Sequence, residues 1–515
     1  MRPRRIIGFA ILTLWGVVAG MHIRREYFRP ETLVLAEGAR SLAPATYFYA
    51  VEMGGRSIGV ATSRLDTLDD GFVFEDVLRL RVPALGALHP ASIRTRTRLG
   101  RALQLRAFEF RLESEVGAFH VTGRARTDSV LELRLDAGAS RQASTIPLDP
   151  SMTLPVALPL RMAAAGRLRE GGEYATTVFD PSTLSDRAVR VRVTGRDLLP
   201  VVDSVARSGR RQVWAPVRYD TIPVWVVEES YGGVQITSWL DQDGRLVRAE
   251  SPMGFTLRRE PFELADQRWQ RDSADASLAR GYGTVIEGTA ISSDADLSAD
   301  AGGPNGLVAR LVNVELEGFD LEGGTQTLRG DTLTVRRARW PTRSSYALPY
   351  AGGGPPAGAL ASTPLIQAED LRIVARARSI AAGSTDPAVV ARRLSDWVHG
   401  ALRKEITLSI PSAVQVLEAG QGDCNEHTVL YVALARSLGL PARTAVGLVH
   451  VRGRFYYHAW PEVWLGEGWV PVDPTLGQVP ADASHLRFLV GGLARQVELV
   501  RLIGRLDIDI VHGSR

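Results

Sequence analysis

Gly-Gln-Gly-Asp-Cys-Asn-Glu-His (420–427) is the stretch that decides the fold of the C-terminal part of this chain. It carries Cys424, the only cysteine in the sequence. Asp423 is a strong helix N-cap residue, and Glu426 three residues later completes a capping box. An apolar run follows and ends at Gly439, a typical C-cap glycine. The sequence therefore predicts that Cys424 lies in the first turn of a buried helix.

That position suits a nucleophilic thiol. The helix macrodipole favours negative charge in the first turn, and so favours a thiolate. Gly420 and Gly422 are expected to leave room for the backbone of a substrate. The backbone N–H of Cys424, with Gln421 as a second candidate, is predicted to hold an oxyanion.

Two further blocks carry the partners of such a thiol. Tyr-Tyr-His-Ala-Trp-Pro-Glu-Val (456–463) contains His458, and Trp-Val-Pro-Val-Asp-Pro-Thr (469–475) contains Asp473. Their composition predicts the two arms of a β-hairpin. With the turn centred at 465–466, the two side chains face each other about 5 Å apart, and a register shifted by two residues leaves them diagonal neighbours. A thiol, an imidazole and a carboxylate are the parts of a nucleophilic site.

The order of these blocks resembles the transglutaminase-like superfamily, above all its bacterial branch. The resemblance covers roughly 365–495, and it rests on three separate motifs that occur in the same order. It implies an α+β papain-like core in which Cys424, His458 and Asp473 form a catalytic triad.

Other conspicuous side chains are interpreted more modestly. Trp460 and Glu462 match prominent positions of the family motif, and we interpret them as cleft-lining or supporting residues. His427, His450 and His485 have no partner pattern, so we interpret them as surface or packing residues.

Composition excludes several classes of protein. The chain has 515 residues, of which 45% are hydrophobic and 23% charged, which is typical of globular proteins. Its formal net charge is +4, with acidic residues interspersed throughout, so no nucleic-acid partner is expected. A single cysteine excludes an intramolecular disulfide framework. No motif for a metal or another cofactor is found.

The N-terminus has the pattern of an exported protein. Arg4 and Arg5 precede an uncharged apolar run from Ile6 to Ile23. Such a run predicts a transmembrane anchor, with a cleaved signal peptide as the alternative. We therefore expect a single-pass protein of the cell membrane with most of the chain outside the cytoplasm, or a secreted or periplasmic protein after cleavage.

The middle of the chain has the period-two pattern of β-strands. Residues 47–64 read as strand, turn and strand, and residues 225–250 read as a three-strand meander. Strands at 308–316 and 328–336 are expected to extend this β domain, while 487–490 and 497–510 are expected to add strands to the catalytic sheet. The expected organisation is a membrane anchor or signal segment at 1–30, an antiparallel all-β domain at 31–265, a linker with additional strands at 266–360, the α+β catalytic domain at 361–495 and a C-terminal strand or tail at 496–515.

Two functions from different classes fit this organisation. The first is a thiol-dependent acyl-transfer enzyme that acts on peptide or glutamine amides through a thioester, with hydrolysis or protein crosslinking as its outcome. The second is a non-catalytic envelope binding or scaffold protein that uses the same fold for peptide recognition. The triad residues favour the first.

Overall fold

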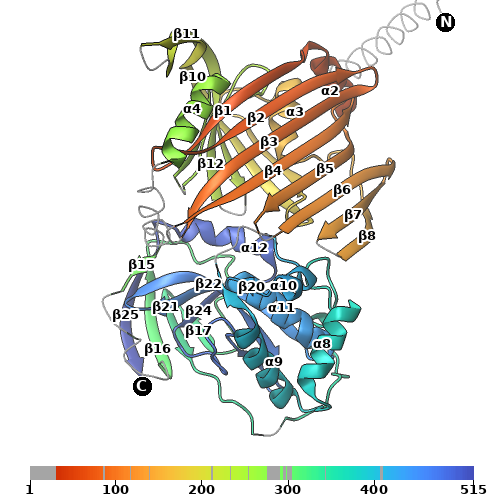
Figure 1. The fold of residues 1–515 in the computed structure, drawn as a ribbon, viewed down its shortest axis with the longest axis vertical. Coiled ribbons are helices and arrows are strands. Elements are labelled where there is room, and N and C mark those ends of the chain that lie inside the picture. The colour runs from red at the N-terminus through yellow and green to blue at the C-terminus, as the bar shows by residue number, and fades with distance from the viewer. Residues whose placement is uncertain are drawn as a thin grey trace, which may run out of the picture.

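The computed structural model describes residues 30–514 apart from 85–86, 116, 138–139, 210–212, 232–233, 253, 275–289, 294–296, 298–303, 343 and 406–409. The apolar segment at 6–23, on which the membrane anchor was predicted, lies outside these residues. Among the helices that are described, none has the length and apolar character needed to span a membrane. The described chain forms an upper body, built mostly of strands, and a lower body of helices and smaller sheets (Figure 1).

A 14-stranded antiparallel sheet, counted over the described residues, makes up the upper body. It consists of two meanders, β1–β8 and β9–β14, which join through the pairing of β1 with β14. The first contains β1 Ala45–Met53, β2 Arg56–Leu68, β3 Gly71–Ala84, β4 Ala87–Gly100, β5 Leu105–Ser114, β6 Gly117–Thr127, β7 Val130–Ala137 and β8 Ser140–Pro147. The second contains β9 Glu173–Asp180, β10 Ser185–Ser208, β11 Val213–Tyr231, β12 Val234–Leu240, β13 Leu246–Glu250 and β14 Phe255–Arg259. The prediction of a large antiparallel β region is confirmed.

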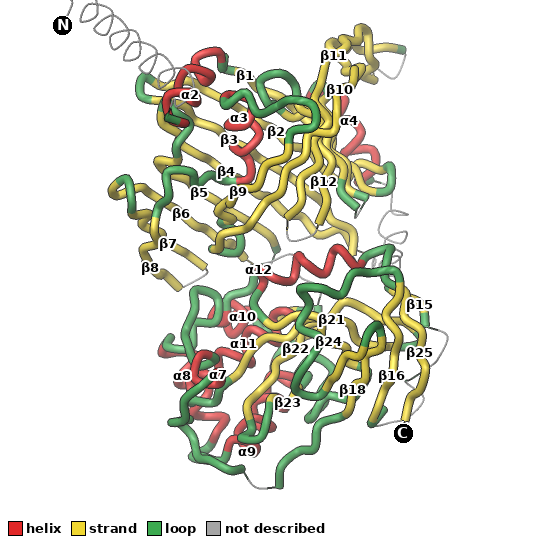
Figure 2. Tube along the Cα trace, turned by 180° about the vertical axis from the view of Figure 1, so that it is seen from behind, coloured by secondary structure: helices red, strands yellow, loops and turns green. Residues whose placement is uncertain are grey.

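Short helices cover both faces of this strongly curved sheet (Figure 2). On one face α4 packs against β1 and β2, where Ala50, Val60 and Trp269 form a buried cluster. On the other face lie α3 and the turn that precedes it. The helices of this body are α2 Glu31–Gly38, η1 Ala39–Ser41, η2 Pro155–Ala157, α3 Leu158–Ala164 and α4 Phe262–Ser273.

The lower body combines a helical layer with a five-stranded sheet, counted over the described residues, in which β15, β22, β21 and β24 lie in that order and β23 pairs with β22. Asp386 caps α9 through the amides of Ala388 and Val389, as the Asp-Pro pair predicts. The helices are α7 Pro355–Gly358, α8 Leu371–Ala381, α9 Pro387–Ala401, α10 Ala413–Ala419, α11 Cys424–Ser437, α12 Leu493–Gln496 and η3 Val497–Leu502. The strands are β15 Ile291–Ser292, β21 Ala442–Val451, β22 Arg454–Trp464, β23 Trp469–Pro471 and β24 His485–Val490, with β19 Arg403–Lys404 and β20 Gln421–Gly422 forming a separate pair.

A third sheet corrects two expectations. Strands β16 Gly306–Val312, β17 Gln326–Arg329 and β18 Thr332–Arg336 do not extend the upper sheet but pair among themselves and with β25 Asp507–Ser514. Their buried side chains share a cluster with β21, β22 and β24, so they belong to the lower body. The expected strand at 497–510 is present only in part, because 497–502 is a 3-10 helix and 507–510 belong to β25, which pairs with β16 and not with the five-stranded sheet.

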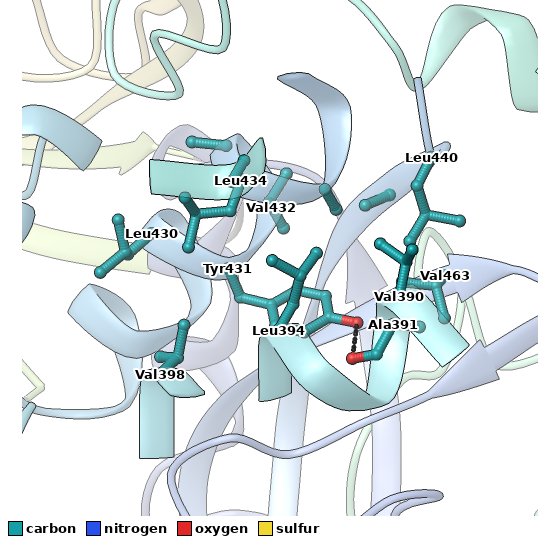
Figure 3. Packing of buried hydrophobic residues seen from close by; sticks show 14 of the residues in the cluster. Val390, Ala391, Leu394, Val398, Leu430, Tyr431, Val432, Leu434, Leu440 and Val463 are labelled. Atoms are coloured by element: carbon teal, nitrogen blue, oxygen red, sulfur yellow. Dashed lines mark hydrogen bonds between the residues drawn. The ribbon is translucent and has the colours of Figure 1, made fainter. Parts of the chain in front are cut away.

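Helix α11 is the centre of the lower body. Its buried residues pack against α8, α9 and α10 on one side and against the sheet on the other (Figure 3). The hydroxyl of Tyr431 donates a hydrogen bond of 3.1 Å to the carbonyl of Ala391 and so ties α11 to α9. The rigid seating of α11 fixes the position of its first residue, Cys424.

This packing predicts a large effect of truncation at Leu394, which is fully buried between α9 and α11. Leu394→Ala is expected to lower the free energy of unfolding by about 2–5 kcal/mol, because it leaves a cavity that the helices cannot fill. Leu371→Ala on the neighbouring helix is the control, since Leu371 is 82% exposed and its truncation should change stability by less than about 0.5 kcal/mol. Urea titrations of both variants measure this, and equal losses would contradict the packing.

Candidate functional site

Cys424 is the first residue of α11, as predicted. The side chain of Asp423 accepts a hydrogen bond of 2.8 Å from the amide of Asn425, and Oε2 of Glu426 accepts one of 3.0 Å from the amide of Asp423. This capping box does not use the amide of Cys424, which stays available for an oxyanion. The cysteine is partly exposed. The first turn of α11 therefore carries both the sulfur of Cys424 and a backbone amide that can bind an oxyanion beside it.

The two glycines before the cysteine have structural roles that the sequence did not reveal. Gly420 ends α10 in the left-handed region, at φ +64°. A Cβ atom on Gly422 would lie 2.2 Å from the Cβ of Glu426, so only glycine permits the close approach that the capping box requires. Gln421 lies between them, and its side-chain oxygen accepts a hydrogen bond from Arg403.

His458 comes from β22 and Asp473 from the loop that follows β23. Nε2 of His458 and Oδ2 of Asp473 are 2.8 Å apart. The hairpin pairs Val463 with Val470 and Trp464 with Trp469, which is the register shifted by two residues. The expectation that His458 and Asp473 face each other directly was therefore wrong, and the diagonal arrangement holds.

The loop after β23 fixes the carboxylate of Asp473. The backbone of Asp473 pairs with Gln478 in both directions, at 2.8 and 2.9 Å. Its Oδ1 accepts hydrogen bonds from the amides of Thr475 and Leu476, at 2.8 and 3.0 Å. These bonds engage Oδ1, so Oδ2 is left to accept a hydrogen bond from the imidazole of His458. The side chain of Asp473 has no exposed surface.

The opposite charges of His458 and Asp473 stabilise each other in this buried site. Burial alone would lower the pKa of His458, but the charge of Asp473, its hydrogen bond and the Cys424 sulfur raise this pKa to about 9. Burial would raise the pKa of Asp473, yet the charge of His458 and the hydrogen bonds from His458 and His485 hold it far below its ordinary value. Because Nε2 of His458 binds Asp473, Nδ1 is the ring nitrogen left for the Cys424 thiol, which contributes to the raised pKa of His458. The imidazole thus retains its proton at neutral pH beside the sulfur.

His485 is a member of this network that sequence reasoning missed. It is 3% exposed, and its Nε2 lies 3.0 Å from the same Oδ2 of Asp473. Its Nδ1 lies 3.3 Å from Oδ1 of Asp482. Burial alone would lower the pKa of His485, but its hydrogen bonds to Asp473 and Asp482 raise it to about 9. The interpretation of His485 as a surface or packing residue is therefore corrected: it is a buried cation between two carboxylates.

The same three side chains have the spacing of a metal-binding group. The ligand atoms of His458, Asp473 and His485 lie within 4.8 Å of one another. Both Nε2 atoms, however, approach one carboxylate oxygen at hydrogen-bond distance, so each must donate a proton to it. A cation would have to replace both bonds. The donor set fits proton handling better than metal binding.

Trp460 and Glu462 support the site from the interior, and neither lines an open cleft. Trp460 is 1% exposed; its ring stacks on His458, with 6.0 Å between centroids, and meets His485 edge-on. Glu462 is 2% exposed and accepts hydrogen bonds from Arg443 at 2.8 Å and from Arg487 at 3.0 Å. These contacts join β21, β22 and β24 behind the imidazole.

Residues 374–474 match the family model described as the transglutaminase-like superfamily. No curated protein matches the chain. The match spans the helix that begins at Cys424, the strand that carries His458 and the loop at Asp473.

Solved structures show weaker likenesses. A candidate cysteine protease from Cytophaga hutchinsonii is 14% identical with a TM-score of 0.28, covering 39% of this chain and 83% of its own. A β-barrel-like DUF1849 protein from Brucella abortus is 15% identical with a TM-score of 0.31, covering 42% and 95%. The periplasmic domain of TgpA from Pseudomonas aeruginosa is 17% identical with a TM-score of 0.24, covering 38% and 86%. TM-scores this low transfer no activity to this chain. The motifs and the family match together identify residues 374–474 as a domain of the transglutaminase-like superfamily.

Proposed function

We propose that the protein is a cysteine-dependent acyl-transfer enzyme that acts on amides of peptides or of glutamine side chains and passes the acyl group mainly to water. The observation that carries the proposal is the position of His458, between the sulfur at the start of α11 and a fully buried carboxylate. In this arrangement a protonated imidazole stabilises a thiolate, and the carboxylate stabilises the imidazolium.

The proposed reaction has two steps. The thiolate of Cys424 attacks the amide carbonyl carbon, and the C–S bond forms while the amide of Cys424 stabilises the oxyanion. The C–N bond then breaks as His458 gives its proton to the leaving amine, which leaves a thioester. A water molecule gives a proton to His458 as it attacks this thioester, the C–S bond breaks, and the carboxylic acid is released while Cys424 returns to its thiolate form beside the protonated imidazole. A primary amine in place of water would give a crosslinked amide.

The experiment uses the single cysteine as a reporter. The full-length protein is incubated with casein, and separately with a glutamine-donor peptide plus a labelled primary amine. We expect hydrolysis products in excess of labelled amide, and intact mass after acid quenching should show the acyl group on Cys424. Absence of both turnover and a thiol adduct with either substrate would overturn the enzymatic proposal and favour a role in peptide binding.

His485 is expected to tune the site as a positioning residue. His485→Gln removes the buried positive charge that lies beside Asp473. The carboxylate of Asp473 then interacts with His458 alone, so the pKa of His458 rises. The pH at which activity falls on the alkaline side should move upward, and kcat should fall by roughly 10-fold or more. A pH–rate profile of kcat measures this. His427→Gln is the control, because His427 bonds to the carbonyl of Asp423 and not to Asp473. An unchanged or lowered alkaline limb in His485→Gln would contradict this role.

A further inference from the structure

The upper body contains a partly open cavity of about 390 Å³ that the acyl-transfer chemistry does not use. Its lining lies entirely within residues 45–257, on β1–β4, on β11–β14 and on η2 and α3. This volume is in the range of sites for small ligands. The catalytic side chains all belong to the lower body.

The cavity lies on one face of the sheet, as the alternation of side chains along β1 shows. Tyr47 and Tyr49 on β1 line it, whereas Ala50 on the same strand packs under α4 on the other face. Most of the lining is apolar, from side chains such as Leu65, Phe74, Leu78, Ile93, Leu160 and Leu240. Such a space suits the hydrocarbon part of a ligand.

One row of polar side chains crosses this apolar wall. Tyr47 pairs with Ser63, Ser63 with Asp76, and Asp76 with Thr95, in adjacent strands, and all four line the cavity. Oδ1 of Asp76 is buried and has no hydrogen-bond partner among the described residues. A buried carboxyl oxygen without a partner is costly, and a ligand that donates to it would remove that cost.

The arginine that lines the cavity, Arg245, is already engaged. The guanidinium of Arg245 donates to the hydroxyl of Tyr47 at 2.9 Å and to the carbonyl of Ala43 at 2.5 Å, and it lies 3.8 Å from Asp243. On the opposite wall the carboxyl group of Glu229 is 7% exposed and lies 3.4 Å from the hydroxyl of Tyr231. The cavity therefore offers acceptors for a positive group and has no uncommitted arginine for a negative one among the residues that line it.

We propose that this cavity binds an amphipathic amine, with the hydrocarbon chain in the apolar part and the ammonium group on Asp76 and its polar row. An ammonium group has three donors, and Oδ1 of Asp76 with the hydroxyl oxygens of Ser63 and Thr95 supplies the matching acceptors. Its positive charge would compensate that of the carboxylate inside an apolar space.

Binding should depend on pH. Burial raises the pKa of Asp76 to about 7, and it does the same for Glu229. The ionisable groups around Asp76 are Glu75 on its own strand and Tyr49 on β1, with Arg259 and Asp241 paired behind that tyrosine. An alkyl ammonium keeps its proton in this range while Asp76 loses its own, so affinity should rise by about tenfold from pH 6 to pH 8.

Calorimetric titration of the full-length protein with decylamine, decanol and decanoate tests the proposal. We expect decylamine to bind at least tenfold more tightly than decanol at pH 8. Asp76→Asn should remove this preference and retain the affinity for decanol, which shows that the cavity is intact. The control is Asp66→Asn, which alters an exposed carboxylate on β2 that pairs with Arg64 and should change nothing.

Three outcomes would overturn it. Equal affinity for amine and alcohol would leave a purely apolar cavity, and tighter binding of decanoate would assign the head-group site to Arg245. Failure of all three probes to bind would exclude a ligand of this class. None of these outcomes bears on the chemistry of Cys424, so the proposal stands or falls independently of the acyl-transfer function.

Discussion

Cys424→Ala is expected to abolish turnover of amide substrates, lowering kcat by roughly four to six orders of magnitude. The proposed thioester cannot form without the sulfur, and alanine offers no other nucleophile. Because the chain has no second cysteine, no neighbouring thiol can substitute for it. Release of amine from the glutamine-donor peptide measures the rate, and intact mass should show no acyl adduct on the variant.

Two controls separate chemistry from folding. Ser437→Ala changes a small side chain at the far end of the same helix, where its hydroxyl donates to the carbonyl of Leu434, and it should keep wild-type activity. Cys424→Ala itself should unfold at the wild-type urea concentration within a small margin, because Cys424 is only partly buried. Residual activity of Cys424→Ala within tenfold of wild type would exclude a covalent role for this residue.

The features of the site that depend on neighbouring residues in the sequence were predicted correctly. Asp423 and Glu426 determine the start of α11 through bonds that span three residues, so the position of Cys424 could be read from the sequence. The partnership of His458 with Asp473 followed from two arms of one hairpin. The register of this hairpin did not follow, because the turn closes between Leu465 and Gly468, and residue types alone do not determine where a turn of this length closes.

The second histidine could not be found in this way. His485 reaches Asp473 only because β24 pairs with β21, which places it on the same side of the sheet as the imidazole of His458. Trp460 lies against both rings, so the three side chains form one packed group that exists only in the folded sheet. The short spacing from Asp482 to His485 was the one local signal, since the two side chains contact each other.

Long-range pairing explains what was missed elsewhere. The period-two pattern indicated an antiparallel sheet, but the pairing of β1 with β14 joins segments about two hundred residues apart in the sequence. The pairing of β16 with β25 spans a similar separation in the sequence, and both strands belong to the lower body. Alternation indicates which side chains share a face, and it does not indicate which strand lies beside which.

Asp473→Asn is expected to lower kcat by roughly 10³- to 10⁴-fold while leaving Cys424 in place. The carboxylate holds the proton on His458, and an amide supplies no charge to stabilise the imidazolium. With that charge gone the pKa of His458 falls, because burial alone lowers it. The alkaline limb of the pH–rate profile should move down, opposite to the shift expected for His485→Gln. A pH–rate profile of the variant on the glutamine-donor peptide checks both effects.

The same substitution should change how stability depends on pH. Both histidines have a folded-state pKa of about 9, against an ordinary value of 6.5. The stability that they contribute is therefore complete below pH 6.5 and is lost as the pH rises through 9. Asp473→Asn removes the charge that raises both values, so it should cost about 3–5 kcal/mol at pH 6 and clearly less at pH 9.5.

Asp482→Asn provides the contrast that separates catalysis from stability. Asp482 contacts His485 and not His458, so its loss should weaken the pH dependence of stability while kcat falls far less than in Asp473→Asn. Urea titrations at pH 6 and 9.5, beside kcat for both variants, measure the two effects. If Asp482→Asn abolished activity as completely as Asp473→Asn, the carboxylate of Asp473 would have no special role, and the four residues would act as a single structural network.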